Sequence, residues 1–178
     1  MEPALKQGPV FLMNIETFKK KYDKFLEFIL FIMMIALAVV VIMGVSFRWG
    51  GSALVWYDEV AAVQLAWLTY YGSAYAALKG GHISVPSILR AFPLGLRRVL
   101  FFISKFFIYG FFAMLTFYGF KVMYLIQGET LTTLEWVPQP FAQSVIPIAS
   151  ILFIISETLN FKNSYQQMME GKIVGGEE

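Results

Sequence analysis

Apolar residues along this chain are gathered into long blocks separated by short polar stretches. A helix needs about 20 predominantly apolar residues to cross the hydrocarbon core of a bilayer, and four blocks reach that length. They predict transmembrane helices over about 25–47, 57–79, 99–126 and 140–161. Pro147 predicts a kink in the fourth, which neighbouring helices in a membrane can accommodate. The pattern therefore predicts an all-α integral membrane protein with four transmembrane helices in one membrane domain, residues 25–161.

Two further segments, 1–24 and 84–98, combine apolar residues at helical spacing with basic residues at the remaining positions. The amphipathic part of the first begins at Val10, and Pro93 predicts a bend in the second. Basic amphipathic helices of this kind lie in the headgroup plane of a membrane. We therefore predict interfacial helices here, with phospholipid headgroups bound by Lys19, Lys20, Lys21, Arg90, Arg97 and Arg98.

The basic residues are distributed unevenly between the two sides of the predicted membrane domain. Eleven lysines and arginines lie before the first span, between the second and third spans, or after the fourth span, which are all on one side of the membrane. Only Arg48 and Lys121 fall on the opposite side. Cytoplasmic loops of membrane proteins carry the excess of Lys and Arg. Both termini, including a tail over 162–178, are therefore predicted to be cytoplasmic.

Composition supports a membrane environment and narrows the function. Charged residues make up 15% of the chain, against about 25% in soluble domains, and the net charge of +2 is too small to indicate nucleic acid as a partner. The chain has no cysteine and one histidine, His82, so thiolate and multi-histidine metal or haem sites are not expected. No nucleophile–base set is visible either. The chain is therefore not expected to be an enzyme or to hold a cofactor.

An ionisable residue at membrane depth usually marks a substrate, ion or proton pathway. No such residue lies near the middle of a predicted span, because Glu27, Asp58, Glu59, Lys105 and Glu157 all fall within about two turns of a span end. Lys105 is expected to extend to the cytoplasmic face. This pattern argues against a transport pathway within this chain alone.

Several residues near the span ends could bind a partner or serve the helix itself. Trp56, Asp58 and Glu59 open the second span, where acids stabilise a helix N-terminus and aromatic residues anchor at the headgroups. The same acids could instead bind a basic residue of a partner. Arg48 could bind an acidic partner or a lipid phosphate. His82 could be pH-sensitive or could bond loop carbonyls.

The order of residues in the middle of the chain resembles a known family. A tryptophan and two acids open the second span, another tryptophan lies about two turns later, and a basic residue, two glycines and a His-Ile pair follow the span. From about Lys20 to Phe161 the chain resembles the small membrane subunit of tripartite ATP-independent periplasmic (TRAP) transporters. The residues that carry the resemblance are Trp56, Asp58, Glu59, Trp67, Lys79, Gly80, Gly81, His82, Ile83 and Val85. Pro86 departs from it, because an aspartate is frequent at this position in the family.

The resemblance implies partners and a location. Family members pair in the bacterial inner membrane with a large multi-span permease subunit, which holds the substrate and sodium sites. A periplasmic substrate-binding protein delivers an organic anion with a carboxylate, such as a sialic acid or a dicarboxylate, and the sequence is similar to the sialic-acid branch. The small subunit would then be a membrane scaffold without a cofactor of its own. Its candidate partner-interface residues are Arg48, Trp56, Asp58, Glu59, Trp67 and His82.

Two alternatives remain at the level of the sequence. A self-sufficient dimeric four-helix exporter would place a glutamate well inside its first span, whereas Glu27 lies at the edge of this one. A membrane assembly factor cannot be separated from a scaffold subunit by sequence. Co-purification with a large permease would distinguish these classes of protein.

Overall fold

The computed structural model describes residues 8–80 and 93–170, with the side chains of 16–80, 93–166 and Met169. The helices are α1 (Gly8–Trp49), α2 (Tyr57–Lys79), α4 (Leu94–Leu125), α5 (Gln139–Gln143) and α6 (Val145–Glu170). Within the described residues there is no strand, only an isolated bridge between Thr130 and Pro138 in the loop before α5. The all-α prediction is thereby confirmed.

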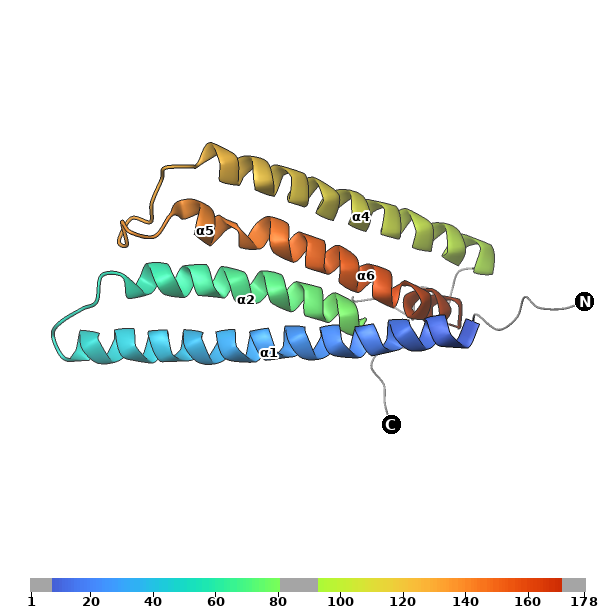
Figure 1. Cartoon of the computed structure of the whole chain (residues 1–178), viewed down its shortest axis with the longest axis horizontal. Helices are drawn as coiled ribbons and strands as arrows, with labels where there is room; N and C mark the ends of the chain where they lie inside the picture. The colour runs from blue at the N-terminus through green and yellow to red at the C-terminus, as the bar shows by residue number, and fades with distance from the viewer. Residues whose placement is uncertain (1–7, 81–92, 171–178) are drawn as a thin grey trace, which may run out of the picture.

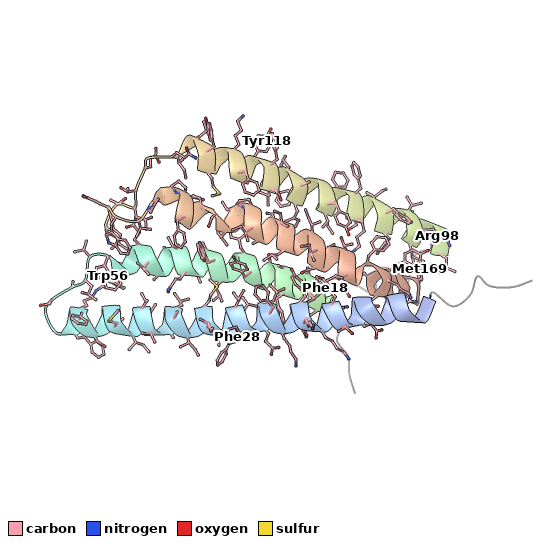
Figure 2. All side chains as sticks on the ribbon, viewed as in Figure 1. Phe18, Phe28, Trp56, Arg98, Tyr118 and Met169 are labelled. Atoms are coloured by element: carbon pink, nitrogen blue, oxygen red, sulfur yellow. The ribbon has the colours of Figure 1, made fainter. Side chains whose placement is uncertain are left out.

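The four long helices form a row in the order α1, α2, α6, α4. The packing of α2 against α1 and α6, and of α6 against α4, defines this order. Seen down the shortest axis of the molecule, the helices lie beside one another (Figure 1), so the row is about one helix thick. Side chains project from both edges, where Phe28 points away from α2 and Tyr118 away from α6 (Figure 2). The inner helices therefore have protein on two sides, and the edge helices on one.

The row has two different ends. We call the end with loops 50–56 and 126–138 the loop end, and the end where α1 and α4 begin and α2 and α6 end the terminal end (Figure 1). Trp56 lies at the loop end and Arg98 at the terminal end (Figure 2).

Among the described residues, three helical segments are long and apolar enough to cross a membrane: Glu16–Trp49, Leu94–Leu125 and Gln139–Gln166. They correspond to the first, third and fourth predicted spans. The second, α2, matches its predicted bounds but is not among these three, so a fourth span is not confirmed. Apolar side chains stay exposed over much of α1 and α4. A lipid environment removes the hydrophobic penalty that water would impose on such a surface.

The N-terminal part of α1 is continuous with the first span. Residues 10–43 contain neither glycine nor proline, so nothing in the backbone interrupts the helix, and α1 runs unbroken over 42 residues. The sequence predicts an interfacial helix over 10–24 followed by a separate span from Phe25, but the structure has no break between them. The interfacial helix in this segment is not confirmed.

A glycine ends α2 and a proline precedes α4. Gly80 ends α2 with a φ of 73°, the left-handed conformation that glycine adopts without strain. Pro93 stands just before α4 in an extended conformation, and so separates residues 94–98 from the rest of the predicted interfacial segment. Those residues belong to α4, whereas 84–92 lie outside the described part of the chain.

Pro147 lies close to the break predicted in the last helix. The helix is interrupted at Ser144, between α5 and α6, because a proline ring clashes with the backbone one turn earlier and lacks an N–H. The ring packs against Gly119 of α4, where an added Cβ would lie 2.9 Å from Cδ of Pro147. The glycine thus permits the close approach of α4 to α6.

Candidate functional site

Polar side chains hold the loop end of the row together. The Arg48 guanidinium at the end of α1 donates a hydrogen bond to the Tyr57 hydroxyl, lies 5.4 Å from the centroid of that ring, and approaches the Asp58 carboxylate to 3.8 Å. Tyr57 is buried, whereas Arg48 and Asp58 are exposed. Arg48 therefore joins α1 to α2 and leaves both charged groups accessible.

Glu59 attaches the long loop to α2. Its two carboxylate oxygens accept hydrogen bonds from the backbone N–H groups of Thr132, at 2.9 Å, and Thr133, at 2.8 Å. The Thr133 hydroxyl donates a third. Within the described part of the chain, no side chain caps the N-terminus of α2 at Trp56. Glu59 thus has a structural role that the sequence did not predict, either as a helix N-terminal acid or as a partner-binding acid. A role for Asp58 or Glu59 in binding a partner stays a prediction.

The two predicted tryptophans lie on one apolar groove beside α2. The Trp67 indole donates a hydrogen bond to the Ala142 carbonyl, at 2.9 Å, and its ring centroid lies 5.2 Å from that of Phe141. Trp56 lines the same groove, nearer the loop. Trp67 therefore joins α2 to α5 within this chain and also helps to form a concave surface.

A buried ion pair joins α4 to α6 toward the terminal end. The ammonium of Lys105 binds the carboxylate of Glu157, and the residues are only 8% and 1% exposed. The Phe101 and Phe161 rings lie 5.1 and 5.9 Å from the ammonium. The prediction that Lys105 extends to the cytoplasmic face is therefore wrong. Lys105 lies on the side of α4 that packs against α6, and the carboxylate there provides a partner.

A second group of polar contacts joins the terminal end of α1, α2 and α6. Lys79 binds Asp23 at 2.7 Å, and the Tyr22 hydroxyl donates to the Leu152 carbonyl at 2.8 Å. Asn160 accepts a hydrogen bond from Lys19 at 3.3 Å. These contacts could not be recognised from the sequence, because they connect residues that are 56 to 141 positions apart.

Most of the described headgroup candidates lie at the terminal end with their basic groups accessible. Lys20, Lys21 and Arg98 are exposed, whereas Lys19 and Arg97 are half-buried. Lys19 and Lys20 line a polar hollow of about 870 Å³ between α1 and α6, which Lys79 and Lys162 also border. Glu16 and Asp23 line the same hollow, so the four lysines leave an excess of positive charge there. Such an excess suits anionic headgroups, and lipid binding stays a prediction. Arg90, another headgroup candidate, and His82, a candidate for partner binding, lie outside the described residues.

Between the two ends, the row is free of acidic and basic side chains. Residues 28–47, 60–78, 106–120 and 139–156 contain no Asp, Glu, Lys, Arg or His. At about 1.5 Å per residue these ranges are about 22–30 Å long, close to the roughly 30 Å of the hydrocarbon core. We call this zone the charge-free belt. Among the described residues, no group of three or more potential metal ligands exists.

The charge-free belt and the exposed apolar helices define a multi-pass membrane protein. Residues 17–166 match the family described as tripartite ATP-independent periplasmic transporters, DctQ component. The match covers most of the chain, which therefore belongs to this family, and the resemblance seen in the sequence is confirmed. The family consists of transporter components that work with a large permease and a periplasmic binding protein, not of enzymes. No curated protein matches the chain.

Proposed function

We propose that the chain is a membrane scaffold for the large permease subunit of its transporter, and that the large subunit holds the substrate and sodium sites. The charge-free belt carries this proposal. A path for an anion and sodium through this chain would be expected to contain charged groups at membrane depth. The charged contacts lie instead outside the belt, where they join neighbouring helices and the long loop.

The position of α2 supports it as the fourth span. It has 23 residues, about 35 Å at 1.5 Å per residue, which exceeds the thickness of the hydrocarbon core. Because α1 and α6 cover two of its sides, its polar-tipped residues need not face lipid. We place the terminal end of the row on the cytoplasmic side of a bacterial inner membrane, because the basic residues concentrate at that end.

Single cysteines test this topology, and the chain has no native cysteine to interfere. We expect cysteines at Ser52 and Thr132, both in loop-end segments, to react with a membrane-impermeant maleimide added to intact spheroplasts. A cysteine at Asn163, exposed near the end of α6, should react only after the membrane is permeabilised. Labelling of Asn163 but not of Ser52 in intact spheroplasts would reverse the proposed orientation.

Family membership supports the proposed class of substrate. We propose an organic anion with a carboxylate, such as a sialic acid or a dicarboxylate, whose uptake is coupled to sodium in the large subunit. This chain would then affect uptake through assembly rather than through contact with the anion.

The scaffold proposal predicts that the purified chain transports nothing by itself. Liposomes that contain only this chain should show no sodium-dependent uptake of radiolabelled sialic acid or succinate above that of empty liposomes. Liposomes with the large permease as well, supplied with the periplasmic binding protein, serve as the positive control. Uptake by the chain alone would favour the self-sufficient exporter.

A further inference from the structure

An apolar groove of about 680 Å³ lies between α1 and α2 toward the loop end. Ile32 and Ala36 of α1 form one wall, Val60 and Gln64 of α2 form another, and Leu134 and Phe141 belong to the loop and α5. Four separate elements therefore contribute to one concave surface. Most of the groove falls within the charge-free belt, so its surroundings are membrane or a membrane-embedded partner.

Gln64 is a polar side chain in this otherwise apolar lining. Its Oε1 atom is buried and accepts no hydrogen bond from the described residues. Gln64 lies seven residues after the start of α2, about 10 Å deeper at 1.5 Å per residue. A buried amide without a partner is unfavourable, most of all in hydrocarbon, where water cannot replace the missing partner. A turn of the Gln64 amide toward the groove would bring this oxygen to the surface, so the groove suits an occupant that is apolar but supplies a hydrogen-bond donor there.

We propose that this groove receives the side chains of a transmembrane helix of the large permease subunit, and that one of them donates a hydrogen bond to Gln64. The inference rests on the proposed function, because it assigns the site at which the scaffold would bind the large permease subunit. A Ser, Thr, Asn or Tyr side chain would supply the donor, as in other helix pairs within membranes. A lipid acyl chain could fill the apolar lining but has no donor at this depth.

The test uses the full chain, affinity-tagged and co-expressed with its large permease subunit. Gln64→Leu removes the acceptor at similar volume, and Ala36→Phe fills the groove. Val39→Phe makes the same kind of change three residues further along α1, at an exposed position outside the groove, and is the matched control. The affinity of each variant for the permease in nanodiscs and the thermal unfolding of each isolated variant are measured.

We expect Gln64→Leu to bind the permease about three- to tenfold more weakly, the range that interhelical hydrogen bonds support. The isolated variant should be at least as stable as the original chain, because it loses an unpartnered acceptor. Ala36→Phe should reduce assembly by about tenfold or more, since an added aromatic ring in a packed contact is strongly unfavourable. Val39→Phe should bind within about twofold of the original chain.

Three results would overturn the inference and leave the proposed function standing. Assembly of both groove variants at the original affinity would show that the partner sits elsewhere, and an equal loss with Val39→Phe would show an effect unrelated to the groove. If assembly persists but less phospholipid co-purifies with Ala36→Phe, the groove is a lipid site. Failure of the original chain to bind the permease would instead overturn the proposed function, and the inference with it.

Discussion

Replacing Glu157 by glutamine should destabilise the isolated chain by about 3–5 kcal/mol, because it leaves the Lys105 ammonium buried without its counter-charge. The geometry makes this loss large. Glu157 is 1% exposed and Lys105 is 8% exposed, so water cannot readily take over the lost interaction. The neighbouring Phe101 and Phe161 rings attract the ammonium, but they cannot neutralise it. Reversible unfolding in detergent, followed by intrinsic fluorescence, measures the change.

A double variant separates the ion pair from the general effect of substitution. Lys105→Met combined with Glu157→Leu removes both charges, and replacing a buried pair by apolar residues is often close to neutral. Because Glu157 makes a further contact besides the pair, we expect recovery of most of the lost stability rather than all of it. Lys121→Met, an exposed charge on the same helix, is the control and should change stability by less than about 0.5 kcal/mol. A Glu157→Gln variant as stable as this control would contradict the buried pair.

A side chain at Gly44 should force α1 and α2 apart at the loop end. A Cβ atom built on Gly44 would overlap the ring of Tyr57. That ring cannot move away freely, because it is buried and its hydroxyl binds Arg48. We therefore expect Gly44→Ala to destabilise the chain by about 1–3 kcal/mol, the usual range for overpacking, and Gly44→Leu to destabilise it further. The same unfolding measurement detects both effects.

The matched control for Gly44 is another helical glycine. A Cβ added at Gly110 of α4 would meet no atom of the described residues within 4 Å, and alanine forms helices better than glycine by about 1 kcal/mol. Gly110→Ala should therefore be neutral or slightly stabilising. If Gly44→Ala and Gly110→Ala behaved alike, the close contact between Gly44 and Tyr57 would not exist.

The sequence predicts helices well where local signals mark their ends. The predicted range of α2 agrees with its observed bounds because loop residues precede it and Gly80 ends it. The other predicted ranges differ because hydropathy marks only the apolar part of a helix. Residues 8–24 of α1 and 162–170 of α6 are too polar to be recognised as span, yet their backbones continue the helix. Membrane boundaries and helix boundaries are different quantities.

Contacts between helices were harder to predict. The sequence predicts that Lys105 and Glu157 each lie near the end of a span, but their pairing depends on the register between α4 and α6. One signal in the sequence could have indicated burial. Lys105 falls at helical spacing with Phe101, Ile108 and Phe112, positions that face α6 in the structure. The partner of Glu59 in the long loop carried no comparable signal.

A row that is one helix thick has a consequence for the purified subunit. Four helices in a compact bundle shield much of their surface from the solvent. Among the helices that the structure describes, α1 and α4 have only one neighbouring helix each along most of their length. When this subunit is extracted without its partner, both flat sides must be coated by amphiphile. It should therefore carry an unusually large detergent collar for its 20.3 kDa, and elute earlier from a sizing column than a bundle of equal mass.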